Sequence, residues 1–296
     1  MASKQFQGVY TAIVTPFRKD QSVDWTALES LVSLQIAGGV AGIVPCGTTG
    51  ESPTLSEEEQ GKVIAQVIKW VNKRCQVIAG TGSNSTAKTI HLSRHAEEVG
   101  ADGLLIVNPY YNKPTQEGLY RHFVAVAESV KIPLVVYNIR GRTAVNVETP
   151  TLERIIKARS NVVAVKEASG DLNQMKQVLD VAPSYFSVLS GDDNLTYELL
   201  KLGGSGVVSV ASNVIPKEMV ELVQHCLAGE FDRAKTLHER YSKFFEGLFL
   251  ETNPIPVKAA LAMKGLCEEV YRLPICEMSA DKRAVWKKML EEYSLL

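Results

Sequence analysis

The sequence lacks the features that mark several special classes of protein. No apolar run approaches the roughly 18 residues of a membrane-spanning helix. The net charge is only −1, so no overall field attracts nucleic acid or an acidic membrane. The five cysteines form no CxxC pair, and residues 1–8 are polar, unlike a secretory signal. We therefore expect reduced thiols, a cytoplasmic location, and no nucleic-acid or membrane partner.

What the sequence does contain is enough apolar material for a large core. Of its 296 residues, 45% are hydrophobic and 22% are charged, which is typical of a globular protein. This length allows one or two domains, and α/β barrels often reach about 250 residues as a single domain.

Eight short apolar runs, rich in Val, Ile and Leu, are separated by longer amphipathic stretches. Such nearly unbroken runs are typical of parallel strands that are buried on both faces. The predicted strands span residues 9–14, 41–46, 76–79, 103–107, 134–137, 162–165, 186–189 and 206–210.

Helical patterns fill the gaps between these runs. Asp24 is a candidate cap for the first helix, Ser56 with Glu59 forms a capping box, and Gly100 stops a third helix. After the first helix, helices are predicted over residues 57–72, 85–99, 115–130, 149–158, 172–181 and 195–202, followed by 216–228, 231–248, 254–264 and 280–293.

Eight strand–helix units without a Pro- or Ser-rich linker predict a closed (β/α)₈ TIM barrel of the α/β class. We place the barrel in residues 1–230 and a C-terminal helical extension in residues 231–296, which gives no chemical signal of its own. An open doubly wound sheet is the structural alternative.

In a (β/α)₈ barrel the catalytic side chains lie at the C-terminal ends of the strands. Lys166 follows the apolar run 161–165, so its amine is expected to be partly desolvated. Burial disfavours the charged ammonium, and a neutral amine can attack a carbonyl carbon to form a Schiff base. The alternative is a structural lysine, paired with Glu167 or another carboxylate at the rim.

Schiff-base chemistry requires proton transfer, and hydroxyl groups follow the neighbouring strands. Tyr137, Tyr111 and Thr49 are the candidates for such a relay, although a lone tyrosine is more often a core ring with a satisfied hydroxyl.

Residues 47–50 resemble an anion-binding turn, in which backbone N–H groups and the Thr48 and Thr49 hydroxyls suit a carboxylate; an ordinary tight turn is the alternative. Arg142 offers a fork for a second carboxylate, or it is simply a surface arginine.

Other motifs carry no function that we can assign. Gly80-Thr-Gly82 lacks the third glycine of a dinucleotide fingerprint, and no HExxH pattern is present. His91 and His95 lie one turn apart in a polar helix and are expected to be solvated. Asp192 and Asp193 have no partner cluster for a metal. We predict no metal and no cofactor.

Together the motifs resemble the dihydrodipicolinate synthase family of pyruvate-dependent lyases over nearly the whole chain. The resemblance rests on Thr15-Pro-Phe17, Gly47-Thr-Thr-Gly-Glu-Ser52, Pro109-Tyr-Tyr111, Tyr137-Asn138, Gly141-Arg-Thr143, Lys166-Glu167, Ser190-Gly-Asp-Asp193 and Asn253-Pro-Ile-Pro-Val-Lys258.

The resemblance implies condensation of pyruvate with aspartate 4-semialdehyde to give 4-hydroxy-tetrahydrodipicolinate, in lysine and diaminopimelate biosynthesis. It implies that Lys166 forms the imine, that Tyr137 exchanges protons with it, and that Thr49 relays protons between Tyr137 and Tyr111. Tyr111 is expected at a subunit interface of a homotetramer built from two dimers. Substrate binding falls to Thr48, Thr49, Arg142, Gly191 and Val208.

Sister families share the lysine and the first tyrosine. Lyases of the N-acetylneuraminate type have Gly-Thr-Gly-Glu in place of the Gly-Thr-Thr-Gly-Glu found here and lack the Gly-Arg-Thr run. Thr49 and Arg142 therefore favour the synthase, with a sugar-acid aldolase, of the N-acetylneuraminate or 2-keto-3-deoxy-gluconate type, as the alternative.

Two positions depart from the family pattern. Arg140 stands where proline is usual; either the loop tolerates the change, or specificity has shifted toward a more anionic substrate. In an effector pocket predicted from Ser52, Asn84, Lys88 and Tyr110, Lys88 occupies the usual position of an acidic residue. A cation there would repel lysine, so we expect weak or absent feedback inhibition by lysine.

Overall fold

The computed structural model describes residues 4–296 and shows a closed barrel of eight parallel strands. The strands follow one another in sequence order, and β8 pairs with β1 to close the ring. Their bounds are β1 (Gly8–Ala12), β2 (Gly42–Val44), β3 (Gln76–Gly80), β4 (Gly103–Val107), β5 (Leu134–Asn138), β6 (Val162–Glu167), β7 (Ser187–Ser190) and β8 (Gly206–Ser209). The predicted barrel is confirmed and the open sheet is excluded. Of the polar segment 1–8, the first three residues lie outside the described part.

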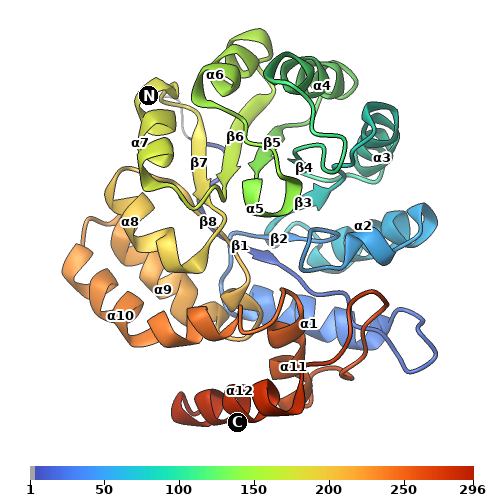
Figure 1. Cartoon of the computed structure of the whole chain (residues 1–296), viewed down its shortest axis with the longest axis vertical. Helices are drawn as coiled ribbons and strands as arrows, with labels where there is room; N and C mark the ends of the chain where they lie inside the picture. Colours follow the sequence, from blue (N-terminus) through green and yellow to red (C-terminus); the bar gives the residue numbers. More distant parts are fainter. Residues whose placement is uncertain (1–3) are drawn as a thin grey trace.

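Helices surround the ring of strands, as Figure 1 shows. They are α1 (Trp25–Ala37), α2 (Glu57–Val71), α3 (Thr86–Glu98), α4 (Gln116–Glu128), α6 (Thr149–Ala158), α7 (Leu172–Val181), α8 (Thr196–Lys201) and α9 (Pro216–Leu227). The predicted caps are confirmed: Asp24 accepts from the Ala27 N–H, and Ser56 and Glu59 form the reciprocal capping box of α2.

The sequence does not predict α5 (Arg140–Thr143), because this single turn is too short to show a helical period. Figure 1 shows α5 near the centre of the ring of strands. Arg140 begins this turn, and the first position of a helix is also where proline is readily accommodated. Arginine in place of proline therefore preserves a local geometry that either residue can adopt.

Side chains fill the barrel interior and form a floor beneath its C-terminal mouth. One buried cluster gathers the inward-facing residues of all eight strands, among them Tyr10, Val44, Ile78, Leu105, Val135, Ala164, Leu189 and Val208. Gly42 makes room for the ring of Tyr10, because a Cβ at this position would lie 2.6 Å from two ring carbons. The barrel is thus a packed core, and only its mouth is free for chemistry.

The C-terminal region adds α10 (Phe231–Gly247), α11 (Ile255–Met263) and α12 (Ala280–Glu292) along one side of the barrel, with α11 drawn below α1 in the view of Figure 1. Trp286 of α12 is fully buried and stacks on Phe244 of α10 with ring centroids 5.5 Å apart. Its indole N–H donates to the Pro256 carbonyl at 2.8 Å. One side chain therefore joins all three helices.

A buried ion pair connects this region to the turn that follows β2. Lys258 Nζ of α11 lies 2.5 Å from Glu51 Oε1, and both side chains are almost fully buried. Lys258 Nζ also lies 4.1 Å from the centroid of the Phe17 ring. Burial lowers the pKa of Lys258, and the attraction of Glu51 opposes that effect. The pair fixes residue 51 from the far end of the chain.

Within residues 4–296, no helix combines the length and the low polarity that crossing a bilayer would require.

We predict that Trp286→Ala lowers the free energy of unfolding by about 3–5 kcal/mol, because it removes a fully buried ring and leaves a cavity. Val285→Ala on the same helix is the matched control, since Val285 is 51% exposed and should change stability little. Urea unfolding followed by circular dichroism measures both variants. Equal midpoints for the two would contradict the role assigned to Trp286.

We predict that Glu51→Gln destabilises the protein by about 3–5 kcal/mol, because it leaves the Lys258 charge buried without its partner. The double substitution Glu51→Gln with Lys258→Met removes both charges and should recover most of the loss. Melting temperatures of the three proteins test this. A double variant less stable than Glu51→Gln would show that the charges are not coupled in this way.

Candidate active site

Strand register brings Lys166 and Tyr137 side by side at the mouth of the barrel. The two residues are direct partners in the β5–β6 pairing, so their side chains leave the sheet on the same face. Lys166 Nζ lies 4.1 Å from the centroid of the Tyr137 ring. Each residue is only 5% exposed, so the amine is held largely away from bulk water as the sequence predicted.

The salt bridge that the structural-lysine alternative expects at Lys166 is not formed. Among residues 4–296, no carboxylate oxygen lies within 4.0 Å of Lys166 Nζ. Glu167 follows Lys166 in the strand and points to the opposite face. There its carboxylate accepts from Asn138 Nδ2 at 3.2 Å and from the Ser169 N–H at 2.8 Å. Burial raises the pKa of Glu167, and these hydrogen bonds oppose that rise.

The turn after β2 places Thr48 and Thr49 in the lining of the same cavity as Lys166 and Tyr137. Two hydrogen bonds stabilise the turn, one from outside it and one within it. Thr15 Oγ1 donates to the Gly50 carbonyl at 2.7 Å, and the Glu51 N–H donates to the Thr48 carbonyl at 3.1 Å. Glu51 has a left-handed backbone with φ of +53°, and its carboxylate forms the buried pair with Lys258. A strained residue thus shapes this turn, and the C-terminal region anchors it.

The hydroxyl of Thr49 accepts a hydrogen bond from Asn253 Nδ2 at 3.0 Å. Within the described chain, no hydrogen bond joins Thr49 to Tyr137 or to Tyr111. Tyr111 is 89% exposed, with a left-handed φ of +72°, and is not among the residues that line the cavity. A single copy of the chain therefore brings together Lys166, Tyr137 and Thr49 but leaves Tyr111 outside.

Arg142 and Gly191 also line the cavity. The short helix α5 places Arg142 there, and its Nη2 donates to the Asn253 carbonyl at 3.1 Å. Gly191 leaves space for the lysine, because a Cβ at this position would lie 3.1 Å from Lys166 Cε and 2.4 Å from Ala168 Cβ. Val208 lies deeper, in the buried floor of the barrel, and Val210, two residues further on, lines the cavity instead.

Several lining residues have no role predicted from the sequence, namely Asp192, Val210, Phe249 and Asn253. Asn253 occurs within a motif that the resemblance uses, and this was the only signal that could have found it. Asp192 is largely buried; burial raises the pKa of its carboxyl, and the attraction of Lys166 opposes that rise. The region from residue 231 onward thus contributes two side chains, Phe249 and Asn253, to the lining of the site.

The predicted effector pocket lies next to the active site. Ser52, Lys88 and Tyr110 line one hollow, and Thr48 and Arg142 line both this hollow and the cavity of Lys166. Asn84 is not among the lining residues, and its carbonyl accepts from Asn112 Nδ2 at 2.9 Å. Lys88 Nζ lies 3.1 Å from Glu57 Oε1.

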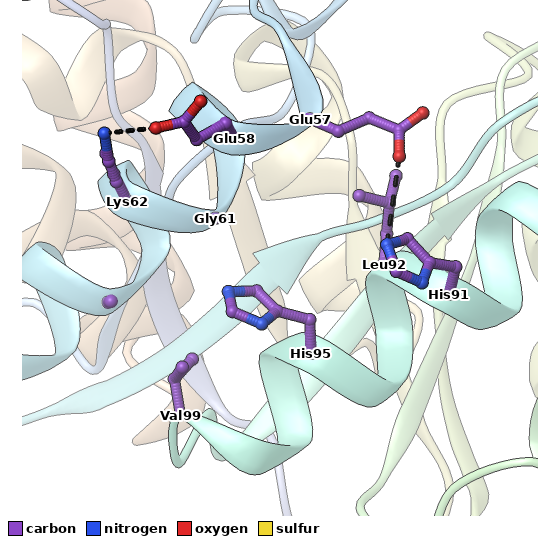
Figure 2. A pocket seen from close by; sticks show the side chains of 9 residues that line it. Glu57, Glu58, Gly61, Lys62, His91, Leu92, His95 and Val99 are labelled. Carbon is purple, nitrogen blue, oxygen red and sulfur yellow. Dashed lines mark hydrogen bonds and ion pairs between the residues drawn. The ribbon is translucent and has the colours of Figure 1, made fainter.

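Another hollow lies between α2 and α3, away from Lys166 (Figure 2). His91 is exposed, as predicted, with Nε2 3.9 Å from Glu57 Oε2. His95 is only partly exposed, and Figure 2 shows its ring directed into the hollow. A Cβ at Gly61 would lie 2.7 Å from His95 Nε2, so the glycine allows the two helices to approach at this point.

Comparisons with known proteins agree with this geometry. Residues 5–293 match the model of the dihydrodipicolinate synthetase family. The 4-hydroxy-tetrahydrodipicolinate synthases of Syntrophus aciditrophicus and Methanocaldococcus jannaschii are 52% and 50% identical to this chain over 291 residues. These alignments cover 98% of this chain and 99% and 100% of the two relatives.

A crystal structure of dihydrodipicolinate synthase from Aquifex aeolicus superposes with a TM-score of 0.97 at 46% identity, covering 98% of this chain and 99% of that one. The match of fold, length and sequence extends across the barrel and the C-terminal helices alike. The chain belongs to the dihydrodipicolinate synthetase family.

Proposed function

We propose that this chain condenses pyruvate with aspartate 4-semialdehyde through an imine on Lys166. The reaction is that of 4-hydroxy-tetrahydrodipicolinate synthase, a lyase of lysine and diaminopimelate biosynthesis, the name carried by the full-length relatives. The observation that supports Lys166 most directly is its buried amine, which lies against the Tyr137 ring and has no carboxylate within 4.0 Å among the described residues.

The chemistry follows from an amine in this setting. Lys166 Nζ attacks the keto carbon of pyruvate, water leaves, and a protonated imine forms. The imine withdraws electrons, so the methyl carbon loses a proton and an enamine results. The enamine carbon attacks the aldehyde of the second substrate. The amine of that substrate then displaces Lys166 from the imine carbon, which closes the ring and frees the enzyme. Tyr137 serves as the proton donor and acceptor at the imine.

The remaining lining residues account for substrate binding. Thr48 and Thr49 hold the pyruvate carboxylate with hydroxyl and backbone N–H groups, as an anion-binding turn does. Arg142 binds the carboxylate of the second substrate with its guanidinium fork. Gly191 supplies the space in which the imine forms beside Lys166 Cε. Val208 contributes by packing beneath the site.

Tyr111 supports a proposal about assembly. A tyrosine that is 89% exposed is available to a second copy of the chain. We propose that it reaches the site of a neighbouring subunit and completes a relay with Thr49 and Tyr137 there, within a homotetramer built from two dimers. A cytoplasmic location belongs to the same proposal, supported by five cysteines that are all free thiols.

We predict that borohydride reduction in the presence of pyruvate adds one pyruvyl group per chain, and that Lys166→Ala abolishes the adduct, because no other amine is held beside Tyr137. Intact-mass spectrometry detects it. Lys176→Ala, at an exposed lysine on α7, is the matched control and should keep the adduct. Condensation with aspartate semialdehyde, and no release of pyruvate from sugar acids, then separates the synthase from a sugar-acid aldolase. An undiminished adduct in Lys166→Ala would falsify the proposal.

We predict that L-lysine at millimolar concentration inhibits the enzyme weakly or not at all, because the Lys88 ammonium repels the ammonium of the effector. Lys88→Glu reverses the charge at this position and should increase sensitivity. Initial rates at increasing lysine concentration test both proteins. A micromolar inhibition constant for the unmodified enzyme would contradict this assignment.

A further inference from the structure

Tyr137 and Lys166 are each followed in the sequence by a polar residue on the opposite face of the sheet. Asn138 and Glu167 are direct partners in the β5–β6 pairing, and strand alternation places both outside the barrel. Asn138 is 1% exposed and Glu167 is fully buried. This outer pair therefore lies at the level of the barrel where the placement of β5 against β6 decides how Tyr137 meets Lys166.

The side-chain amide of Asn138 uses its full hydrogen-bonding capacity. Its Oδ1 accepts from the Val147 N–H and from Asn108 Nδ2, each at 2.9 Å. Its Nδ2 donates to Asn146 Oδ1 at 2.9 Å and to the Glu167 carboxylate at 3.2 Å. The orientation of the amide is fixed at both ends, because a backbone N–H can only donate and a carboxylate can only accept. One side chain thus joins the residue after β4, the end of β6 and the segment between α5 and α6.

The Glu167 carboxylate is stabilised by neutral donors. Its described hydrogen-bond partners are Asn138 Nδ2, the Ser169 N–H at 2.8 Å and Gln174 Nε2 at 3.5 Å. Among residues 4–296, no lysine or arginine nitrogen lies within 4.0 Å of it. A buried carboxylate is costly unless donors surround it, so the loss of one donor, or its replacement by an acceptor, disturbs the whole cluster.

The pairing of β5 with β6 is irregular near its start. The register shifts by one residue after Leu134, and Val163 has no partner in β5. A strand that slips by one residue turns its side chains to the opposite face of the sheet, which would remove the Lys166 amine from the cavity. The hydrogen bond between Asn138 and Glu167 opposes such a slip at the far end of the pairing, beyond the irregularity.

We propose that Asn138 is a positioning residue, which holds the end of β5 against the end of β6 from outside the barrel and so fixes Tyr137 beside Lys166. This role rests on the proposed function and adds to it a residue that does not touch substrate. Imine formation and the proton transfers that follow require the amine and the phenol to reach the same substrate atoms. A misplacement of about 1 Å can cost about a hundredfold in rate, so hydrogen bonds behind the sheet affect the chemistry in front of it.

The isosteric change Asn138→Asp replaces the donor that faces Glu167 with an acceptor. At neutral pH two carboxylates then face each other, and their repulsion separates the ends of β5 and β6. We expect kcat for the condensation to fall about tenfold to a hundredfold. The KM for pyruvate should change less than about threefold, because the turn that holds its carboxylate follows β2. The rate relative to the unmodified enzyme should rise as the pH is lowered, because one carboxyl then takes up a proton and donates it to the other.

A swapped pair tests whether Asn138 acts through Glu167. Glu167→Gln alone should also lower kcat, because its NH₂ group meets only donors, whereas Asn138→Asp with Glu167→Gln restores one donor and one acceptor in the same space. We expect the double variant to recover most of the lost kcat, since coupled residues are non-additive. Asn173→Asp, the same change at an exposed position of α7, controls for the added charge and should leave the rate unchanged. Losses that multiply in the double variant, full activity of Asn138→Asp, or a loss that is independent of pH would each overturn the proposal.

Stability measurements separate positioning from a purely structural role. Rates are measured well below the melting temperature of each variant, where a side chain that only stabilises the fold leaves the kcat of the folded protein unchanged. If Asn138→Asp does not fold, Asn138→Ala decides: a several-fold loss in kcat at constant KM supports the proposal, and an unchanged kcat overturns it. Borohydride trapping of pyruvate on the unmodified enzyme reports separately on Lys166. An adduct there, together with an unimpaired Asn138→Asp, refutes the role of Asn138 alone, whereas the lack of any adduct refutes the proposed function itself.

Discussion

The barrel buries the Lys166 amine, and no carboxylate oxygen of the described residues lies within 4.0 Å of it. The arrangement of the other residues at the mouth of the barrel depends on this buried amine. Taking an amine out of water is costly unless a partner compensates; here Lys166 Nζ lies 4.1 Å from the centroid of the Tyr137 ring, and the Asp192 carboxyl also attracts it. The sheet enforces the arrangement, because neighbouring strands align Lys166 with Tyr137 and strand alternation turns Glu167 away. The position of the Lys166 amine beside Tyr137 is therefore a consequence of strand register.

Much of this was accessible from the sequence. Eight buried strands with helices between them leave few architectures, and the rule that parallel strands end at one face brings Lys166, Tyr137 and Thr49 together. Whether Lys166 forms a salt bridge could not be predicted from the sequence, because it depends on whether a carboxylate distant in the sequence reaches Nζ. Val210 lines the cavity, whereas Val208 lies deeper in the barrel. The pattern of apolar residues in a strand does not show how deep each residue lies.

The contacts that the C-terminal region makes with the site could not be predicted from the sequence either. Asn253 contacts Thr49 and Lys258 contacts Glu51 across more than 200 residues of sequence, and no local pattern encodes such contacts. Arg272 adds a third link by donating to both carboxylate oxygens of Glu59 on α2, which lowers the pKa of Glu59 to about 2. The division at residue 230 remains a prediction, but the helices beyond it hold the turn that carries Thr48 and Thr49.

The ion pair between Glu51 and Lys258 also affects the order in which the protein folds during its synthesis. A ribosome releases the N-terminal part of a chain first, and domains generally begin to fold in that order. The strands that carry Tyr137 and Lys166 therefore emerge well before the segment that anchors the turn after β2. A nascent chain that has completed its eighth strand holds Lys166 and Tyr137 but not yet Lys258, which anchors the turn after β2. The turn after β2 thus gains its buried ionic anchor only when synthesis is nearly over.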